Sequence, residues 1–215
     1  MKNTIRKILI CSGSMLIGAA VILCIYNMIQ DRKANNRSQE VMSELIELIP
    51  ETKASTSADT MKNPADDLFS RYDIDDRVAD VGPTVNINGT DYCGYIFLPT
   101  LKLKLPVIDK WSYDSLNISP CRFSGSANGK DLIIAAHNFS SHFGHIDELK
   151  IGDSLSFYDA DGNVFDYEVA ELNILDSKDS SGMFYGKSEQ WQITLFTCNI
   201  SGTKRIAVRG CIIDK

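Results

Sequence analysis

The chain begins with its longest apolar stretch, residues 8–29, which reads ILICSGSMLIGAAVILCIYNMI and contains no charged side chain. A helix of about 20 such residues crosses a hydrocarbon core of roughly 30 Å and pairs its backbone polar groups internally. The stretch is long for a cleaved signal peptide and lacks an A-x-A-like exit, and Leu23 before Cys24 argues against a lipoprotein. The pattern predicts a single-pass transmembrane anchor over residues 8–29, after a short cytoplasmic terminus, residues 1–7.

The segment after the anchor, residues 30–85, combines a helical pattern with a polar stretch. Apolar residues recur at helical spacing between Val41 and Ile49, and Pro50 ends the pattern. Residues 51–67 are polar and rich in turn-forming side chains, which is typical of a linker. We therefore expect an amphipathic helix followed by a polar linker.

From Asn86 onward the apolar positions follow the two-residue period of β-strands. Strand patterns cover residues 92–98, 103–107, 131–136, 155–157, 165–169, 191–197 and 205–213. Asn88-Gly89 is a tight-turn dipeptide, and Asp161-Gly162 should join two strands as a hairpin. Many short strands without long helices between them predict a mainly β fold, a single closed barrel of about eight strands with short helices over residues 86–215.

Composition narrows the possible functions. The chain is 44% apolar and 23% charged with a net charge of −6, and its first thirty residues are basic, so the remainder is more acidic still. An acidic domain lacks the positive face that nucleic acid requires, which excludes that partner. The six cysteines and three histidines show no zinc-ligand spacing, and an Asp-Gly turn explains Asp159, Asp161 and Asn163. We predict no metal and no cofactor.

Three residues at predicted strand ends suit acyl transfer. IIAAHN delivers His137, TLFTC delivers Cys198, and the next strand opens with Arg205. A thiolate attacks a carbonyl carbon, a nearby imidazole moves the protons, and a guanidinium stabilises a developing oxyanion. His137, Cys198 and Arg205 are therefore the candidate catalytic residues.

Simpler interpretations exist for each of these residues alone. A cysteine or histidine at the end of an apolar strand is commonly structural, and His142 and His145 are expected to be exposed loop histidines. Two alternative functions follow, a plain thiol protease and a non-catalytic surface β-barrel. Hydrolysis by such a protease is unaffected by an added amine, and a structural Cys198 resists mild alkylation.

Several segments together resemble the sortase family of cysteine transpeptidases. TLFTC followed by Arg205 in RIAVRG is similar to the TLxTC-to-Arg segment of sortases, and DLIIAAHN resembles the strand that carries the sortase histidine. GYIFLPTLKLKLPVID resembles the opening strands of the sortase barrel. The resemblance covers roughly residues 94–213 and implies a sortase-type β-barrel.

The resemblance also implies roles for individual residues. Cys198 matches the nucleophile, His137 the general acid/base, and Arg205 the residue that binds substrate and stabilises the oxyanion. Thr197 is expected to help position substrate. Arg209 shares the predicted face of Arg205 and is the second choice for the arginine.

The implied partners are those of a Gram-positive surface enzyme. The substrate would be a surface protein with an LPxTG-like C-terminal sorting signal, and the acceptor an amine of the lipid-linked peptidoglycan precursor of the cell wall, or another amine. Such enzymes work outside the cell, so the resemblance favours a cell-membrane location with an extracellular catalytic domain. A pilin-polymerising transpeptidase is the alternative within the family. No second apolar segment follows Arg205 and no DPF/W-like lid precedes the barrel, which disfavours that alternative and leaves the subclass open.

Overall fold

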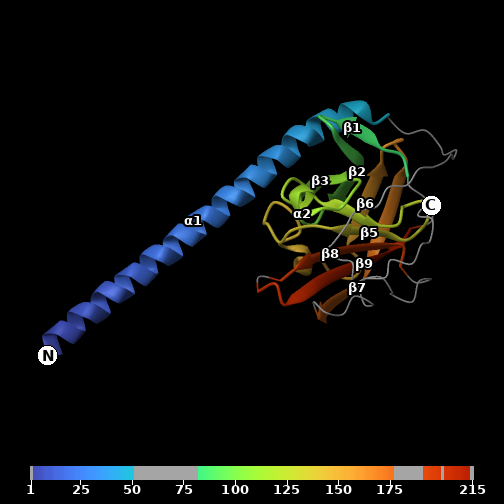
Figure 1. The fold of residues 1–215 in the computed structure, drawn as a ribbon. Coiled ribbons are helices and arrows are strands. Elements are labelled where there is room, and N and C mark those ends of the chain that lie inside the picture. Colours follow the sequence, from blue (N-terminus) through green and yellow to red (C-terminus); the bar gives the residue numbers. More distant parts are fainter. Residues whose placement is uncertain (1, 51–81, 177–190, 200, 214–215) are drawn as a thin grey trace.

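Strands dominate the carboxyl-terminal part of the protein, in a computed structural model that describes residues 2–50, 82–176, 191–199 and 201–213 (Figure 1). Eight strands pair in the order β2-β3-β4-β5-β8-β9-β7-β6, and β6 pairs again with β2, which closes the barrel. Their bounds are β2 Thr90–Leu98, β3 Leu103–Ile108, β4 Cys121–Ser124, β5 Leu132–Ala135, β6 Ser154–Asp159, β7 Val164–Asp176, β8 Ile193–Cys198 and β9 Lys204–Ile212. The prediction of a mainly β fold built on one closed barrel of about eight strands is confirmed.

Three short elements accompany the barrel: strand β1 (Val85–Ile87), helix α2 (Tyr113–Leu116) and the 3₁₀ helix η1 (Ile146–Glu148). β1 adds to the outer edge of β2 through the turn at Asn88-Gly89, where both residues have positive φ, 51° and 82°. A two-residue turn of this kind requires positive φ at both positions, and asparagine followed by glycine supplies it. The turn prediction is therefore confirmed.

Closure of the barrel depends on Gly94 in β2. Gly94 pairs with both Val107 of β3 and Asp159 of β6, and its φ of 142° lies where only glycine is comfortable. A Cβ atom at this position would lie 1.9 Å from the backbone oxygen of Tyr158. Glycine thus lets β2 and β6 approach closely at the point where the sheet joins itself.

The barrel has two apolar clusters because its strands alternate. One cluster fills the interior and includes Ile134 of β5 and Leu195 of β8, both fully buried. The next residues along the same strands, Ala135 and Phe196, belong to a second cluster on the outer face. This outer cluster also includes Leu45 of the amino-terminal helix, so that helix covers part of the barrel wall.

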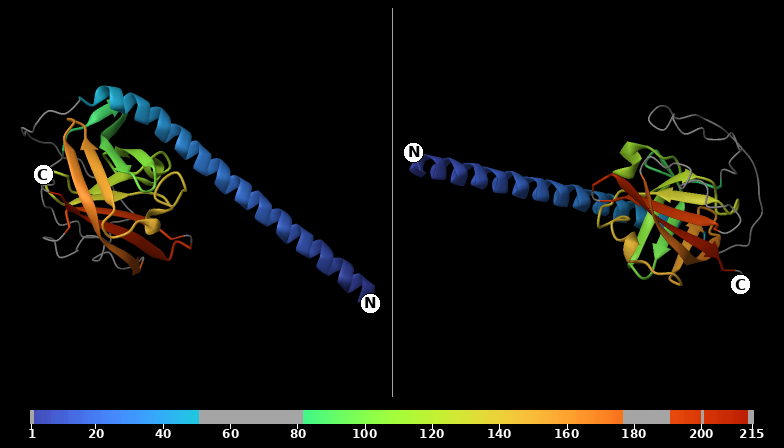
Figure 2. Two further views of the ribbon diagram at one scale, coloured as in Figure 1. Left: turned by 180° about the vertical axis from the view of Figure 1, so that it is seen from behind. Right: turned by 90° about the horizontal axis from the view of Figure 1, so that it is seen from below.

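Helix α1 (Lys2–Leu48) is one continuous helix that runs from the amino terminus onto the barrel (Figures 1 and 2). The part of this helix within Ile10–Leu48 is long and apolar enough to cross a membrane. Its most apolar stretch is not buried against the rest of the protein. The last part packs on the barrel through a stripe of buried residues at helical spacing: Ala34, Ser38, Met42, Leu45 and Ile49.

The expected anchor and amphipathic helix are thus two parts of one helix, which continues through the polar segment between them. Ala34 and Ser38 are small, which allows α1 to lie close to the barrel where docking begins. The predicted linker at residues 51–67 lies outside the described residues.

Candidate active site

Two parallel strands bring His137 and Cys198 to the same edge of the barrel. β5 and β8 pair in parallel with Ala135 opposite Phe196, and each candidate lies two residues beyond this pair. The pairing continues past the strand end, because the Ala136 amide donates to the Phe196 carbonyl at 3.1 Å. Since side chains alternate along a strand, His137 and Cys198 extend from the same outer face as Ala135 and Phe196.

Arg205 reaches the same place through the antiparallel neighbour of β8. Cys198 and Arg205 are direct partners in the β8–β9 ladder, and side chains opposed in this way have Cβ atoms about 5 Å apart. The guanidinium is half-buried and donates from Nη1 to the Gly202 carbonyl at 3.4 Å. The fold therefore gathers a thiol, an imidazole and a guanidinium from three neighbouring strands.

Thr197 faces inward, between the two strand ends. Its side chain is 1% exposed, and its hydroxyl donates to the Ala136 carbonyl at 2.9 Å. This bond ties the residue before Cys198 to the residue before His137. The geometry gives Thr197 a part in holding the two ends together, and its predicted contact with substrate stays a prediction.

The imidazole of His137 is suited to accept a proton in the resting protein. The side chain is half-buried and packs on Phe139, with 4.9 Å between the ring centroids. Burial lowers the pKa of His137 below its ordinary value of 6.5, because desolvation disfavours the charged form. His137 is therefore neutral at pH 7, and a neutral imidazole can take the proton of the half-buried, free Cys198 thiol.

The prediction of exposed loop histidines is wrong for His142. His142 is fully buried, and neither ring nitrogen forms a well-directed hydrogen bond among the described residues. Burial, followed by the nearby His137, lowers the pKa of His142 to about 4. His145 is exposed and lies 2.9 Å from the Glu148 carboxylate. The loop is short and aperiodic, so its sequence did not reveal which histidine turns inward.

Arg209 shares the face of Arg205 but is held elsewhere. It pairs with Thr194 in the ladder, four residues from Arg205, which corresponds to about 13 Å along a strand. The side chain is 4% exposed, forms an ion pair with Glu171 at 2.9 Å, and lies 4.6 Å from the ring centroid of Trp191. These contacts anchor Arg209 away from Cys198.

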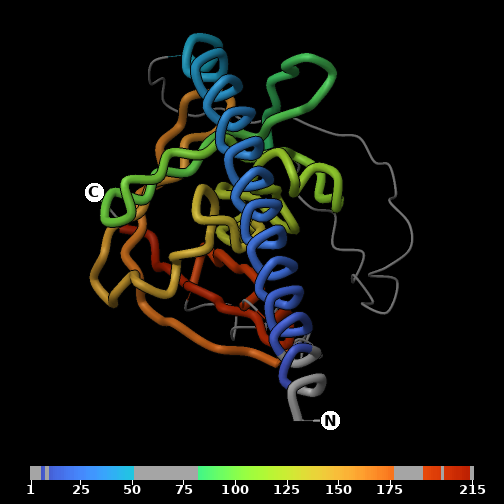
Figure 3. The backbone as a smooth tube through the Cα atoms, turned by 90° about the vertical axis from the view of Figure 1, so that its left-hand side faces the viewer, coloured from blue at the N-terminus to red at the C-terminus, as the bar shows by residue number. Residues whose placement is uncertain are grey.

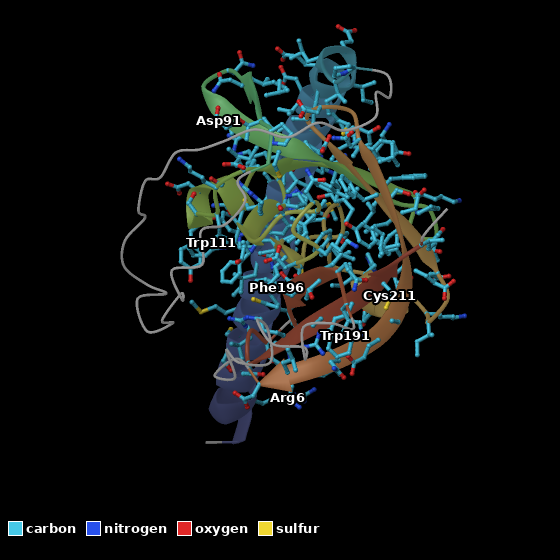
Figure 4. All side chains as sticks on the ribbon, turned by 90° about the vertical axis from the view of Figure 1, so that its right-hand side faces the viewer. Arg6, Asp91, Trp111, Trp191, Phe196 and Cys211 are labelled. Atoms are coloured by element: carbon cyan, nitrogen blue, oxygen red, sulfur yellow. The ribbon has the colours of Figure 1, made fainter. Side chains whose placement is uncertain are left out.

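An aromatic cluster borders the candidate site on the outer face, in which Phe196 is only 7% exposed and Phe123 and Trp111 are half-buried. Phe196, two residues before Cys198, meets Phe123 edge-on with ring centroids 5.2 Å apart, and Phe123 meets Trp111 at 5.9 Å. Figure 4 shows Trp111 and Phe196 on the same side of the barrel. The alternation of TLFTC could have placed Phe196 beside Cys198, whereas nothing in the sequence links it to Trp111.

Cys93, Cys121 and Cys198 are free thiols, which answers for Cys93 and Cys121 the question of pairing that the sequence left open. Cys93 and Cys121 are buried, and burial raises the pKa of each thiol to about 12, so both stay protonated and unreactive.

At the β6–β7 turn the Asp159 carboxylate accepts hydrogen bonds from the Asp161 and Asn163 amides at 3.0 and 2.8 Å. That carboxylate organises the turn, as the Asp-Gly interpretation predicts.

Solved structures with the same fold are sortases of several classes. Sortase C1 from Streptococcus agalactiae matches with a TM-score of 0.54 and 27% identity, covering 63% of this chain and 75% of that one. Clostridium perfringens sortase C with the C-terminal cell wall sorting motif matches with a TM-score of 0.52 and 26% identity, covering 60% and 75%. Sortase A from Corynebacterium diphtheriae, at 20% identity and a TM-score of 0.53 over 59% and 62% of the chains, shares the fold.

Sequence comparison agrees with these structures. No curated protein matches the chain. The sortase-domain family model matches residues 96–212, more than half of the 215 residues, and this range includes His137, Cys198 and Arg205. The chain belongs to the sortase family.

Proposed function

We propose that this protein is a membrane-anchored transpeptidase that cleaves an LPxTG-like sorting signal and transfers the surface protein to an amine of the cell wall. One observation carries the proposal: Cys198 lies opposite Arg205 in the β8–β9 ladder, while the parallel pairing of β5 and β8 brings His137 to the same edge. The solved Clostridium perfringens sortase C that contains a sorting motif adds support for the substrate class.

The first half-reaction forms a thioester. His137 takes the Cys198 proton, and the sulfur attacks the threonine carbonyl of the signal. The developing oxyanion is stabilised by the Arg205 guanidinium, which stays charged throughout. The C–N bond breaks as the imidazolium gives its proton to the leaving amine.

The second half-reaction transfers the acyl group. An amine attacks the thioester carbonyl, a new C–N bond forms, and the C–S bond breaks. The neutral His137 accepts the proton that the amine loses, and Cys198 is regenerated. An amine therefore determines the product, which separates a transpeptidase from a protease.

The half-buried side chains of Phe123 and Trp111, in the aromatic cluster with buried Phe196, support a peptide substrate. The cluster extends from Phe196, two residues before the proposed nucleophile, through Phe123 to Trp111. Aromatic faces of this kind contribute large apolar contact areas. We propose that the exposed parts of Phe123 and Trp111 contact the apolar residues of the sorting signal.

The anchor places the reaction at the membrane. α1 passes directly from its apolar stretch onto the barrel, so the barrel lies on the side of Arg32 and Lys33. We propose that this side is extracellular, because sorting signals and wall acceptors are found there. A pilin lysine, which the family resemblance also implies, is the second candidate acceptor.

The test uses the full chain in lipid nanodiscs with a fluorogenic LPxTG-type peptide, with and without triglycine or a lysine-containing peptide. We expect cleavage by the wild type, and a shift of product to the amine adduct in mass spectra. Cys198→Ala should lose both activities, since the residual rate lacks covalent catalysis. Cys211→Ala is the matched control because it removes another half-buried barrel thiol.

Three results would contradict the proposal. Full cleavage by Cys198→Ala would remove the nucleophile from the mechanism. Hydrolysis that no amine diverts would make the protein a thiol protease, and a Cys198 that resists mild alkylation would favour a non-catalytic barrel.

A further inference from the structure

Helix α1 contacts the loop that follows the candidate histidine. Asp31 lies two residues after the apolar stretch ends, and its Oδ1 accepts hydrogen bonds from the Ser141 amide at 3.1 Å and the Ser141 hydroxyl at 2.6 Å. The hydroxyl also lies 3.3 Å from the Asp31 carbonyl oxygen. Figure 3 shows α1 crossing this side of the barrel. We call this contact the Asp31–Ser141 clamp.

The loop that Ser141 belongs to is closely tied to His137. The Phe143 amide donates to the carbonyl of His137 itself at 3.2 Å, and the Gly144 amide donates to the Phe139 carbonyl at 2.9 Å. The Phe139 ring packs on the His137 imidazole. A displacement of Ser141 is therefore passed to His137 through its own backbone and through the ring beside it.

Space within the loop is also limited. A Cβ atom at Gly144 would lie 2.7 Å from the Phe139 carbonyl oxygen and 2.8 Å from that of Asn138. Phe143 is fully buried in the barrel interior. The loop therefore has a fixed inner side, and Ser141 is the point at which α1 holds it from outside.

Attachment of α1 to the barrel does not require the hydrogen bonds between Asp31 and Ser141. The helix docks through the apolar stripe that includes Met42, Leu45 and Ile49, which supplies the buried area. A half-buried carboxylate adds little to such packing and loses hydration. Its two hydrogen bonds to one loop residue point to a role in ordering that loop.

We propose that Asp31 and Ser141 are positioning residues of the active site, through which the anchor helix holds the loop of residues 139–144 and so fixes the His137 imidazole relative to Cys198. The inference rests on the proposed function for its catalytic consequence. It makes the membrane anchor a part of the catalytic unit.

The test compares Asp31→Ala, Asp31→Asn and Ser141→Ala in the full chain in nanodiscs. Turnover is expressed per reactive thiol, after titration of Cys198 in a background without the other cysteines. Asp31→Ala should lower kcat per thiol by about 10- to 100-fold with little change in KM, because misplacement by an ångström is enough for such losses. Asp31→Asn should stay within about threefold of wild type, since its amide oxygen still accepts both hydrogen bonds.

Matched controls are available on both sides of the clamp. Glu40→Ala removes an exposed carboxylate of α1 outside the clamp, and Ser140→Ala removes the exposed hydroxyl next to Ser141. Both should keep wild-type kcat. Wild-type kcat in Asp31→Ala overturns the proposal, as does an Asp31→Asn variant that falls as far as Asp31→Ala. A contact that only attaches the helix would lower the melting temperature or the titrated fraction and leave kcat per thiol unchanged.

Hydrogen exchange separates this proposal from the proposed function. Asp31→Ala should speed deuterium uptake in a peptide covering residues 138–146, while Glu40→Ala should not. A wild-type chain without cleavage or transfer would refute the proposed function, and the exchange result would still decide whether the clamp orders the loop. Unchanged exchange in Asp31→Ala would refute the clamp even in an active enzyme.

Discussion

At the scale of single residues, strand phase and strand register carry different information. Phase puts Arg205 and Arg209 on one face of β9, and the sequence shows that much. Register separates them, because Arg205 pairs with Cys198 and Arg209 with Thr194. The ladder between β8 and β9 therefore decides which arginine lies beside Cys198, the proposed nucleophile.

The two arginines should respond differently to the same substitution. Arg205→Lys loses the rigid fork of donors and should lower kcat/KM by about 100-fold, in line with the loss of one oxyanion donor. Arg209→Lys should leave kcat/KM within about threefold but lower the melting temperature, since it disturbs the contacts with Glu171 and Trp191. Peptide cleavage and thermal unfolding measure the two effects. The reverse pattern would assign the catalytic role to Arg209.

Buried His142 should make the barrel sensitive to acid. Its pKa of about 4 in the folded state lies below the ordinary 6.5, so the unfolded chain binds its proton first as the pH falls. The contribution of neutral His142 to the free energy of unfolding is fully present above pH 6.5 and is lost as the pH falls toward 4. At pH 5 the loss from this group is about 2 kcal/mol. His142→Phe should reduce the decrease in unfolding free energy between pH 7.5 and pH 5. Substitution of the exposed His145 by Gln should not reduce it. Tryptophan fluorescence reports unfolding, since Trp111 packs on Phe123 of β4 and Trp191 on Arg209 of β9. An equal acid-induced loss of stability in His142→Phe would contradict the assignment.

At the scale of elements, the sequence predicts every strand of the barrel except β4. β2, β3 and β6 to β9 show clear alternation or a turn dipeptide, and β5 shows a continuous apolar run. β4 has four residues, a bulge between Arg122 and Ser124, and no alternation to detect. The predicted catalytic residues stand at strand ends that the pattern located, whereas the Asp31–Ser141 contact joins positions 110 residues apart that no local pattern connects.

Closure of the barrel should fail when Gly94 gains a side chain. Gly94→Ala would drive a Cβ into the Tyr158 carbonyl and should destabilise the barrel by about 3 kcal/mol or more, beyond ordinary backbone strain. Gly152→Ala is the matched control, because Gly152 also has positive φ, 93°, but faces open space. Its cost should be about 1 kcal/mol, the strain of the left-handed region alone. Chemical denaturation measures the free energy of unfolding of both variants. Equal losses in the two variants would show that the close approach of β2 and β6 does not matter.

At the scale of the whole molecule, one helix sets where the barrel stands relative to its membrane anchor. α1 continues without interruption from its exposed apolar stretch to the docked stripe ending at Ile49. In the proposed function, the height of the active site above the membrane is therefore fixed by helix length.

A longer helix should separate membrane-bound from soluble substrates. Insertion of seven helix-forming residues between Ile29 and Gln30 raises the barrel by about 10 Å and turns it by only about 20°. Cleavage of a sorting signal tethered in the same vesicle should slow several-fold, while cleavage of the soluble peptide should not change. A substrate with an equally lengthened spacer should recover the rate. Equal rates on the original tethered substrate would show that helix length does not limit access.

The β8–β9 pairing has a consequence for how this enzyme can diversify. Cys198 and Arg205 are opposed because the two strands are in register, from Ile193 with Gly210 onward, and the turn between them does not set that register by itself. Insertions or replacements in the turn can therefore reshape the rim of the site without parting the thiol from the guanidinium. The substrate preference can therefore change through this turn while Cys198 and Arg205 keep their relative positions.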